Sequence, residues 1–451
     1  MSLQQGNPTA PGKNDRFSSM GFILAAIGSS VGLGNMWKFP YITGEHGGAA
    51  FFLLFIICLI IIGLPVLLAE LAIGRAGRGS AATSYVKAGG PKAFGPLGLL
   101  QVIAPFIILS FYVIIAGWTL HYAFLSFSGQ LFVDSNFGGQ FTAFTGGYMP
   151  MVWQVVAVAL TGFVVARGIS GGIEKFNKIL IPGLIILLIV LMIRAVTLPG
   201  AGAGVSFFLN PDFSKLSTEA ALVALGHAFF SLSLGMGILL TYGAYVDKRQ
   251  SLGTATLAIG AGDLIYAFIA GLIIFPTTAS FGIEPDAGPS LVFIALPAAF
   301  SAMPFGTFFG GLFFTLLSFA ALTSTVSLLE VPVSFAMERW GWGRAKSVVI
   351  ISVVLLLIGL PSVLSFGMAP SLSDMGGKSF FDWLDFITSN ILLPIGGLIT
   401  TIFAGYYWKG AAEGAGLKSG WFRIWLFMLR YVAPILVFLV LLHTTGVINF
   451  E

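Results

Sequence analysis

The stretch GSSVGLGNMWKFP, from Gly28 to Pro40, combines residue types that can bind a small cation and a carboxylate. It continues an apolar run that begins at Met20, yet it contains three glycines, two serines, an asparagine and a lysine. If a membrane helix breaks here, its freed backbone groups need another partner, because no water reaches the bilayer core. Unwound carbonyls can ligate a small cation, and the N-terminal end of a half-helix favours a carboxylate. The stretch therefore predicts one site for a cation and an anionic group together.

The composition predicts a protein that crosses a membrane many times. Of its 451 residues, 57% are hydrophobic and 9% are charged, against roughly 25% charged residues in soluble globular domains. So few charges cannot cover a surface that faces water, which excludes the soluble classes of protein. The one cysteine, Cys58, lies in an apolar run, so no disulfide is possible within the chain.

Several partners and chemistries are not expected. The net charge of +4 does not indicate nucleic acid, because the basic residues lie in short loops between apolar segments. No P-loop pattern is present, so we do not expect ATP to be the fuel. No histidine, cysteine and carboxylate cluster suits a transition metal, and the histidines are scattered at His46, His121, His227 and His443. A membrane enzyme would need a nucleophile–base pair or such a cluster, and we do not expect an enzyme.

Eleven apolar segments are long enough to cross a bilayer, because a membrane helix needs about 20 mostly apolar residues. They cover residues 20–43, 50–74, 95–126, 149–167, 176–198, 219–245, 252–280, 305–338, 346–366, 384–407 and 422–447. A Gly/Phe-rich loop is expected from Ser128 to Gly147. The apolar stretch from Pro289 to Phe300 is too short to span and is expected to lie across the outer face.

Lys and Arg residues are divided unevenly between the two sets of loops, and this asymmetry predicts the orientation. One set holds 17 of the 22 Lys and Arg residues and includes the polar tail at residues 1–19, whereas the other holds little beyond Lys215 and Lys378. Because cytoplasmic loops are the more basic ones, we expect the N-terminus in the cytoplasm. The odd number of spans then places the C-terminus outside.

A second interruption, FFSLSLGMG from Phe229 to Gly237, falls in the sixth segment. The first and sixth segments are thus both broken, and they stand five apart in order. Paired interruptions in corresponding segments of two halves indicate a transporter built from inverted repeats. Small residues also serve as close-packing surfaces between membrane helices, and we interpret Gly74, Gly77 and Gly397 in that way. Close packing does not explain the polar side chain of Asn35.

These motifs are similar to those of the neurotransmitter:sodium symporter family, whose bacterial members are sodium-coupled amino acid transporters. Besides the first-helix signature and FFSLSLGMG, the similar stretches are EHGGAAFF at 45–52, GWTL at 117–120, RGISGGIEKFNKILIP at 167–182, ALTSTVSLLE at 321–330 and WLDF at 383–386. The resemblance covers nearly the whole chain. It implies an all-α membrane protein with a LeuT-type five-helix inverted repeat and with helices 1 and 6 broken. The implied units are a cytoplasmic tail at 1–19, a ten-helix core at 20–407 with repeats at about 20–198 and 219–407, and an eleventh helix with a short extracellular end at 408–451.

The resemblance implies two sodium ions. One would be held by three backbone carbonyls and two hydroxyls, from Gly28, Val31, Ala320, Thr323 and Ser324. The other would be held by the carbonyl of Ser30, by the substrate carboxylate, and by the side chains of Asn35, Ser231 and Asp263. A hard cation prefers several oxygen ligands, which both sets supply.

The resemblance also implies a substrate site around the broken helices. Ser29, Ser30, Ser231 and Gly34 would lie beside the substrate, and Tyr112 would donate a hydrogen bond to its carboxylate. The pocket for the substrate side chain would be lined by Ile108, Phe230, Ser233, Met236, Ser324 and Leu328. Taken singly, a residue such as Tyr112 or Phe230 is more often a packing residue, so the prediction depends on the whole set.

Two gates and one mobile helix are implied. Outside, Lys38 would pair with Asp385, where the family commonly has arginine, and lysine lacks the bidentate fork of arginine. The alternative for Lys38 is that it snorkels to the outer interface. The inner gate would be formed by Lys13 or Arg16 with Tyr245 and Glu338. The pair Gly172 and Pro182 matches a motif for unwinding helix 5, which lets water reach the inner sodium.

Three acids lie within apolar segments, where ionisable residues are functional by default. We expect Glu70 and Glu330 to hold polar backbone at the breaks of the first and sixth helices. Relatives usually have an asparagine at the position of Asp263, and some of them then require chloride. At Ala267, one helical turn on, some chloride-independent relatives keep a glutamate. We therefore expect Asp263 to supply that negative charge itself.

The expected function is a sodium-coupled symporter in a bacterial cytoplasmic membrane. It would import a hydrophobic L-amino acid by alternating access, without chloride, and contact membrane lipid. The alternative is a sodium-coupled transporter of the same fold for another small solute, such as an osmolyte or an amine. An amine without a carboxylate would need an acid on the first helix, where this chain has Ser29 and Ser30. An ion channel is disfavoured because channels are usually built from repeated subunits, whereas this chain carries its own pseudo-repeat.

Overall fold

The computed structural model describes residues 16–283 and 291–448. Every regular element within these two ranges is helical. Nine of them are apolar helices long enough to cross a membrane, and a tenth span is a pair of helices bent by 44° at Val31–Leu33. An eleventh span consists of two helices on either side of Leu232–Gly237. The described chain thus has the eleven expected spans, with the first and the sixth broken.

The spans are named here in chain order. The first is α1 (Ser19–Ser30) with the π-helical turn Gly34–Lys38 and α2 (Phe39–Glu45), and the second is α3 (Ala49–Cys58) with the turn Leu59–Gly63 and α4 (Leu64–Gly77). The third to fifth are α6 (Phe94–Phe127), α8 (Met149–Ala166) and the turn Ile169–Glu174 with α9 (Lys175–Val196). The sixth to ninth are α11 (Thr218–Ser231) with α12 (Ile238–Ala244), α13 (Leu252–Phe281), α15 (Gly306–Trp340) and α16 (Arg344–Leu364). The tenth is α18 (Phe380–Ile387), the turn Thr388–Leu392, α19 (Leu393–Ile402) and the turn Phe403–Tyr407, and the last is α21 (Ser419–Phe427), the turn Met428–Val432 and α22 (Ala433–Thr444).

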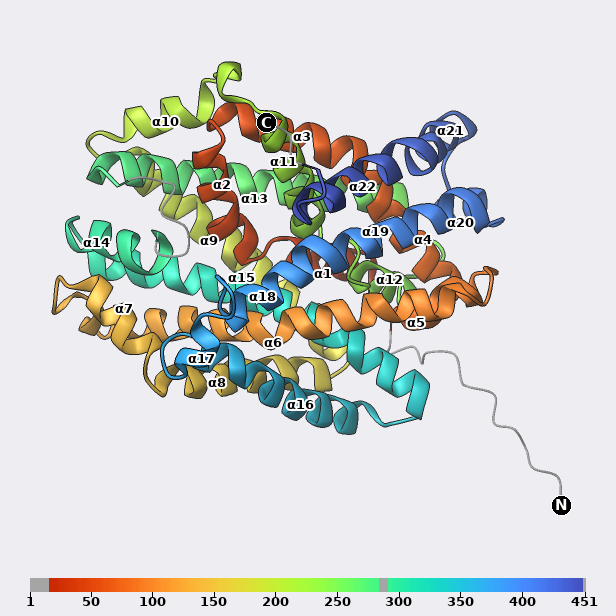
Figure 1. Cartoon of the computed structure of the whole chain (residues 1–451), viewed down its shortest axis with the longest axis horizontal. Coiled ribbons are helices and arrows are strands. Elements are labelled where there is room, and N and C mark those ends of the chain that lie inside the picture. Colours follow the sequence, from red (N-terminus) through yellow and green to blue (C-terminus); the bar gives the residue numbers. More distant parts are fainter. Residues whose placement is uncertain (1–15, 284–290, 449–451) are drawn as a thin grey trace.

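Short helices connect the spans at both ends of the molecule. They are α5 (Ala81–Lys87), α7 (Phe137–Thr145), α10 (Ala201–Leu209), α14 (Leu296–Ser301) after the turn Leu291–Ala295, α17 (Pro370–Ser373) and α20 (Ala411–Ala415), with single 3₁₀ turns at Gln130–Phe132 and Phe213–Lys215. Figure 1 shows α7, α10 and α14 at one end of the long helices and α5 and α20 at the other. The predicted short stretch at 289–300 is helical from Leu291, and its first two residues lie outside the described ranges.

The loop predicted from Ser128 to Gly147 is partly wrong, because it contains α7. The Asn136 side chain accepts a hydrogen bond from the Gly139 amide and caps this helix. Phe141 and Phe144 then pack against the buried Trp118 ring, with ring centroids 5.3 and 6.2 Å apart. The high glycine content suggested an irregular loop, but three phenylalanines at helical spacing form an apolar face that docks on α6.

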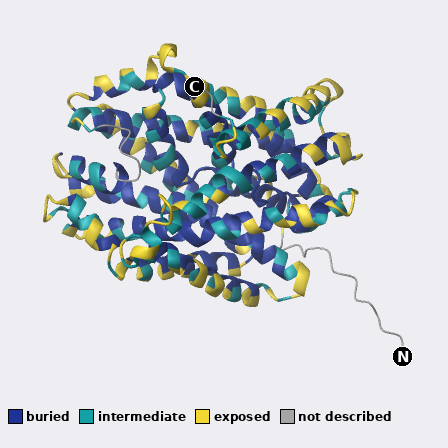
Figure 2. Cartoon of the chain, viewed as in Figure 1, coloured by how far each residue is buried: buried dark blue, intermediate teal, exposed yellow. Residues whose placement is uncertain are grey.

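Helices α1, α6 and α15 form the interior of the bundle. Long α15 packs along α6, while α1 packs against α9, α13 and α15. Within its most apolar window, 83% of α15 is buried, against 39% of α16 and 28% of the last span. Figure 2 shows the same contrast, with buried residues in the middle and exposed residues around the edge. The broken helices therefore lie in the best-shielded part of the protein.

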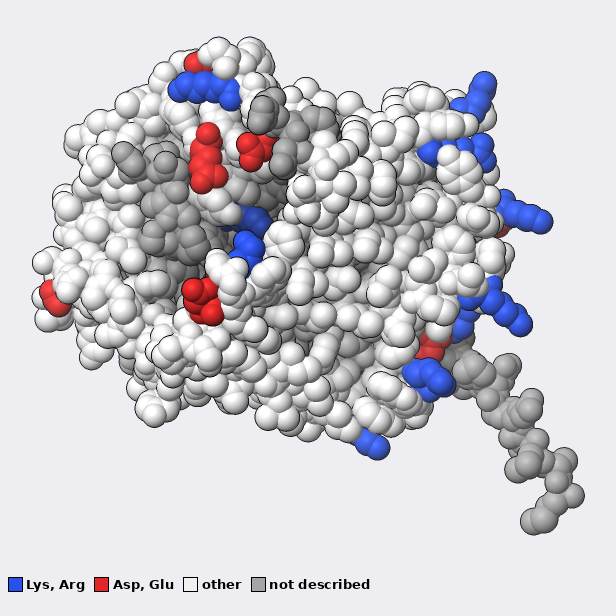
Figure 3. Space-filling view, viewed as in Figure 1, with Lys and Arg blue, Asp and Glu red and all other residues white. Residues whose placement is uncertain are grey.

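Lys and Arg residues gather at one end of the helices (Figure 3). Hydrogen bonds join the loops that meet there: Arg75 donates to the carbonyls of Gln250 and Gly414, and Arg344 donates to that of Val165. We call this end, which also carries Lys87, Lys178, Arg339, Lys346 and Lys418, the basic end. The sides of the bundle between the two ends are largely uncharged in this view, as expected of a surface that contacts lipid.

Candidate functional site

The break in the first span leaves a short irregular link, Val31–Leu33, whose close contacts require glycine at Gly32 and at the adjoining Gly34. Helix α1 ends where the Val31 amide donates to the Ile27 carbonyl, 2.7 Å away, and Gly32 then donates to Ser30 at 3.0 Å. A Cβ atom at Gly32 would come within 2.6 Å of the Ser324 hydroxyl, and one at Gly34 within 2.7 Å of the Phe230 ring. Glycine at both positions therefore lets the first break approach α15 and α11 closely.

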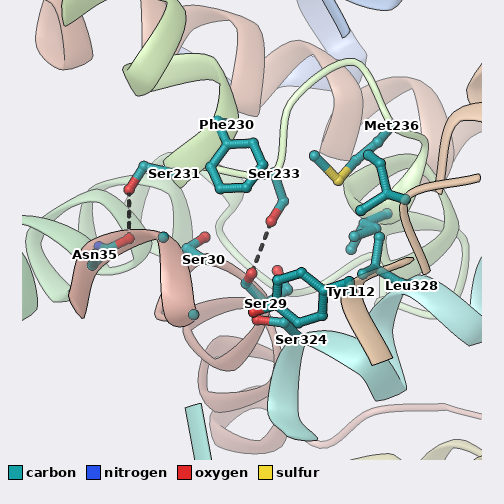
Figure 4. A pocket seen from close by; sticks show the side chains of 14 residues that line it. Ser29, Ser30, Asn35, Tyr112, Phe230, Ser231, Ser233, Met236, Ser324 and Leu328 are labelled. Atoms are coloured by element: carbon teal, nitrogen blue, oxygen red, sulfur yellow. Dashed lines mark hydrogen bonds between the residues drawn. The ribbon is translucent and has the colours of Figure 1, made fainter. Parts of the chain in front are cut away.

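The break in the sixth span has a different geometry, because it passes through left-handed backbone. Ser233, Gly235 and Gly237 have φ values of 56°, 75° and 69°. Ser233 is a non-glycine residue in this region, and its hydroxyl donates to the Ser29 carbonyl at 2.8 Å. The sixth break is thereby hydrogen-bonded directly to the first (Figure 4).

Glu70 supports the sixth break as predicted. Its side chain is fully buried and accepts a hydrogen bond from the Gly235 amide at 2.8 Å. The same expectation for Glu330 is wrong. Both guanidinium nitrogens of Arg344 donate to Glu330, at 2.6 and 3.1 Å, and Tyr245 donates to it at 3.1 Å. A buried carboxylate binds the strongest donor within reach, and here that donor is an arginine at the start of α16.

The two breaks enclose a cavity that the predicted substrate residues line. All eleven of them take part: Ser29, Ser30, Gly34, Ile108, Tyr112, Phe230, Ser231, Ser233, Met236, Ser324 and Leu328. Figure 4 shows Phe230 and Met236 on one side of this cavity and Tyr112, Ser29 and Ser324 on the other. Gly32 and Ile238 also line it and were not predicted, although each directly adjoins a predicted break. Hydroxyl groups thus face hydrocarbon side chains across a small space.

Behind Asn35 and Ser231, which line the cavity, lies a buried carboxylate with an unused oxygen. The first oxygen of Asp263 accepts from Asn35 at 2.8 Å and from Ser231 at 2.7 Å. Its second oxygen has no hydrogen-bond partner among the described residues, although at most 2% of each of the three residues is exposed. An unpaired carboxylate oxygen in the interior is costly. A cation beside amide, hydroxyl and carboxylate oxygens would satisfy it, so these residues suit sodium.

The second predicted sodium set lies where α1 packs against α15. Its ligands Gly28, Val31, Ala320 and Thr323 are all buried, and so is Ser324. The Thr323 hydroxyl donates to the Ala320 carbonyl at 3.0 Å, so the oxygen lone pairs of that hydroxyl remain available to a cation. This set offers only neutral oxygen ligands, which suits a monovalent ion better than a divalent one.

A family model described as the sodium:neurotransmitter symporter family matches residues 14–136 and 146–450. The chain belongs to the sodium:neurotransmitter symporter family. This membership confirms the resemblance inferred from the motifs and, with the structural match below, the LeuT-type architecture.

Relatives of this symporter family match the chain over almost its full length. An uncharacterized sodium-dependent transporter of Bacillus subtilis, YhdH, is 38% identical over 444 residues, covering 96% of this chain and 98% of that protein. An uncharacterized sodium-dependent transporter of Haemophilus influenzae is 35% identical over 440 residues, covering 94% of this chain and 96% of that protein. The solved structure of MhsT in complex with L-phenylalanine matches with a TM-score of 0.90 and 44% identity, covering 96% of this chain and 100% of that chain. The chain is therefore a sodium-dependent membrane transporter.

The predicted outer gate residues of this symporter lie close together. The Lys38 ammonium is 4.0 Å from an Asp385 carboxylate oxygen and 5.0 Å from the centre of the Phe230 ring. A second cavity of about 200 Å³ lies beside them, and Lys38, Asp385, Phe230 and Tyr112 all line it. Phe230 and Tyr112 line both cavities, so these two side chains separate the substrate cavity from the outer one.

The predicted inner gate residues are not brought together. Glu338 pairs with Lys87 and accepts from the Ser80 amide at 2.6 Å, because it lies beside the start of α5. Tyr245 donates to Glu330 instead, and Arg16 lies 3.9 Å from Asp247. Lys13 lies outside the described ranges. Glu338, Tyr245 and Arg16 thus each have a different side-chain partner, so the grouping through Arg16 is wrong for this conformation, whereas the alternative through Lys13 stays a prediction.

Helix 5 is continuous through the predicted unwinding motif, with a π-helical turn at Ile169–Glu174 that includes Gly172 and with Pro182 inside α9. A Cβ atom at Gly172 would come within 2.1 Å of the Val164 carbonyl. Between the two motif residues lies Asn177, which was not predicted. Its side-chain oxygen is buried, has no hydrogen-bond partner among the described residues and faces the backbone of Gly28. A polar residue within an apolar segment was the signal for it.

Proposed function

We propose that this symporter couples the inward flow of sodium to the import of hydrophobic L-amino acids. The observation that carries this proposal is a single cavity with polar groups on one side and hydrocarbon on the other. Ser29, Ser30 and Tyr112 are positioned at the break of the first span, where an amino acid backbone can bind. Ile108, Phe230, Met236, Ile238 and Leu328 supply the apolar wall.

The carboxylate of the substrate would be recognised at the first break. The Tyr112 hydroxyl accepts a hydrogen bond from the Leu33 amide at 3.1 Å, which leaves its own proton available for a carboxylate. The neighbouring α1 offers no acid at Ser29 or Ser30. A sodium ion beside Asp263 would then lie near the same carboxylate, so ion and substrate would stabilise each other. This arrangement favours an amino acid over an amine.

We assign two sodium ions to the two sets of ligands. The first ion would be held by the carbonyl of Ser30 with Asn35, Ser231, Asp263 and the substrate. The second would be held by the carbonyls of Gly28, Val31 and Ala320 with the hydroxyls of Thr323 and Ser324. Because the first set joins α1, α11 and α13 and the second joins α1 to α15, sodium would draw the broken helices together before transport.

Chloride would not be required. Asp263 is a fully buried acid in the first ion set, and its second oxygen has no partner among the described residues. A carboxylate next to sodium stays ionised, because the cation favours the charged form. The charge of the ion would therefore be balanced within the protein. When sodium leaves, a proton would bind Asp263 on the return step.

The substrate range would be broad. The cavity is small, about 30 Å³, so a hydrophobic side chain can enter only if the wall repacks. Met236 is unbranched and flexible, and it lies between two glycines with positive φ. Glycine has the widest choice of backbone conformations, so these two residues let the chain around Met236 change conformation. Substrates from valine and leucine to tryptophan would be accepted, and L-phenylalanine in the MhsT complex falls within this range.

Transport would follow alternating access in a bacterial cytoplasmic membrane, with the basic end in the cytoplasm. Lys38 and Asp385 would close the outer path. Arg16 with Asp247, and Tyr245 with Glu330, would close the inner path. Unwinding of helix 5 between Gly172 and Pro182 would release the second sodium ion to the cytoplasm.

Uptake by the purified protein in proteoliposomes tests the function. Labelled leucine should accumulate with an inward sodium gradient and not when choline replaces sodium, and unlabelled tryptophan should compete. Betaine should not compete. Sodium-driven uptake of betaine without leucine uptake would replace the proposal by the osmolyte alternative.

The same assay tests chloride independence and the role of Asp263. With gluconate in place of chloride, wild-type uptake should persist. Asp263→Asn should lose uptake or regain it only with chloride, since the amide cannot balance the charge of the ion. Wild-type uptake that stops without chloride would refute this part of the proposal and leave the substrate class untouched.

A further inference from the structure

A groove on the outside of the bundle lies between α6, α15 and α16, close to the basic end. Its volume is about 290 Å³, and its eleven lining residues are all apolar or aromatic. Ile103 and Val354 are each 39% exposed, and Trp340 is 55% exposed, so the groove opens away from the protein. The three helices are membrane spans. The groove therefore faces the lipid.

The rim of the groove at the basic end is aromatic and cationic. The rings of Trp340 and Trp342 lie 4.8 Å apart, and the Lys346 ammonium lies 5.0 Å from the centre of the Trp342 ring. Arg339, next to Trp340, is exposed. Neither Lys346 nor Arg339 forms an ion pair within the described ranges, whereas Arg344 is occupied by Glu330. Two positive charges are thus available where the groove meets the membrane surface.

The first turn of α16 adds backbone donors at the same rim. Helix α16 has 21 residues. Its N-cap residue is Gly343, which has no side chain to accept hydrogen bonds from the first amides of the helix. The amide groups at the N-terminus of a helix favour anions such as phosphate. Tryptophan is also enriched at the level of lipid headgroups. The rim therefore suits a phosphate group that is covalently joined to a hydrocarbon.

The far end of the groove lies about one leaflet away from the basic end of the helices. Along α16, the lining extends to Val354, which is ten residues beyond Arg344 and about 15 Å along a helix. On α6, it extends to Phe106, roughly 18 Å from the start of the helix at Phe94. Half of the hydrocarbon core is about 15 Å thick. A single acyl chain that hangs from the headgroup level would fill this length.

We propose that the groove is a binding site for an anionic phospholipid, with one acyl chain between α6, α15 and α16 and its phosphate at Lys346, Arg339 and the first turn of α16. The acidic headgroup is selected by the charge of the rim, and the shape of the groove selects a hydrocarbon chain. Bound there, the lipid braces the connection between α15 and α16, where Trp340 and Trp342 line the groove. This inference does not depend on which solute the protein transports.

The test uses purified full-length protein in detergent, with phosphatidylglycerol and phosphatidylcholine of identical acyl chains. Native mass spectrometry should show one retained phosphatidylglycerol, bound more tightly than phosphatidylcholine, and the lipid should raise the melting temperature. An Arg339→Gln, Lys346→Gln variant should bind phosphatidylglycerol roughly 30-fold more weakly, since it lacks two cations at the headgroup level. A matched Lys418→Gln, Arg423→Gln variant also removes two charges at the basic end, but away from the groove, and should bind like wild type.

Filling the groove tests the acyl-chain part separately. Ile103→Trp adds a ring within the groove without changing charge, and it should reduce the retention of both lipids. Leu99→Trp, at the same groove, serves if the first variant does not fold. Equal binding of the two lipids by wild type, or an equal loss in the Lys418, Arg423 variant, would overturn the charge selection. If the variant with the filled groove retained both lipids like wild type, no acyl chain would occupy the groove. The same conclusion would follow if wild type formed a dimer and filling the groove abolished that dimer, because a second copy of the chain would then occupy the groove.

Discussion

The two ends of the helix bundle are closed by unequal contacts. At the basic end, Glu330 is fully buried and binds Arg344 through two hydrogen bonds and Tyr245 through a third. At the opposite end, Lys38 and Asp385 approach only to 4.0 Å, and their side chains are 28% and 39% exposed. Exposed ion pairs contribute about 1 kcal/mol or less, whereas breaking a buried pair costs several. The closure at the basic end is therefore the stronger one.

Further contacts at the basic end fix the start of the first span. Glu174 accepts from the Ser18 amide at 2.8 Å and from the Ser18 hydroxyl at 2.6 Å, and Lys178 pairs with Glu174 at 2.5 Å. The Phe17 amide donates to the Tyr245 carbonyl at 3.3 Å. Opening this end must break several bonds together. The basic end is thus held by several buried contacts of the protein itself, whereas the Lys38–Asp385 pair at the opposite end is single and partly exposed.

The largest expected effect comes from breaking the buried pair. Glu330→Gln leaves the Arg344 guanidinium without its carboxylate, and removing one member of a buried pair costs about 3–5 kcal/mol. We expect a lower melting temperature and faster hydrogen exchange of amides in α12 and in the last turns of α15. Exchange that stays at the wild-type rate would contradict the assignment of this pair as the main closure.

A smaller effect is expected at Glu338, which is matched to Glu330 because it lies on the same helix. Glu338 accepts from the Ser80 amide and pairs with the half-exposed Lys87. Glu338→Ala removes both this cap of α5 and the pair with Lys87, and we expect a loss of about 1 kcal/mol, typical of helix caps. Faster hydrogen exchange should be confined to α5. If it spread to α12, the basic end would be a single cooperative unit and not a set of separate contacts.

The opposite end can be strengthened by Lys38→Arg. The guanidinium can form two parallel hydrogen bonds to the Asp385 carboxylate, which lysine cannot. We expect slower hydrogen exchange in α2 and α18 and slower substrate entry, with a change in the free energy of unfolding of less than about 1 kcal/mol. Asp385→Asn is the control and should have the opposite effect on exchange. Identical exchange in wild type and both variants would show that this pair does not hold the closure.

The smallest effect is expected at Asp247, in the loop after α12. The backbone amide of Arg249, followed by the charges of Arg249, Arg16 and Arg78, lowers the pKa of this carboxyl below its usual value. A lowered folded-state pKa contributes stability above the unfolded value of about 3.9, and this contribution is lost only as the pH falls through the folded value. Between pH 5 and 8, the range of ordinary assays, the melting temperatures of wild type and of Asp247→Asn should therefore depend on pH in the same way. A difference in that range would mean that Asp247 is protonated near neutral pH.

The spans and the substrate cavity could be predicted from sequence because their signals are local. The lengths of the apolar segments predicted the spans. Stretches rich in glycine and serine marked the two breaks, where backbone N–H and C=O groups are free of helical hydrogen bonds. Ile108 and Tyr112 lie on another helix with no break, and only the resemblance to a family placed them. The structure then brought all the predicted substrate residues to one cavity.

The contacts of charged residues could not be predicted in the same way. Glu330 was expected to hold a break, but its partner Arg344 begins the next helix, and only the packing of α15 against α16 brings the two together. Glu338 likewise binds a short helix that no sequence signal had indicated. Which donor reaches a carboxylate depends on three-dimensional distances of a few ångströms, and these are not encoded in local residue patterns.

Ser233 shows how two separate parts of a carrier are kept in step. Glycine would adopt its left-handed backbone at no steric cost, yet the serine supplies the hydroxyl that holds the Ser29 carbonyl. Whatever displaces the sixth helix at this point must therefore pull on the first. This one hydrogen bond therefore opposes independent movement of the two breaks. A backbone strain of about 1–3 kcal/mol at a single residue is thus the cost of this link between the two breaks.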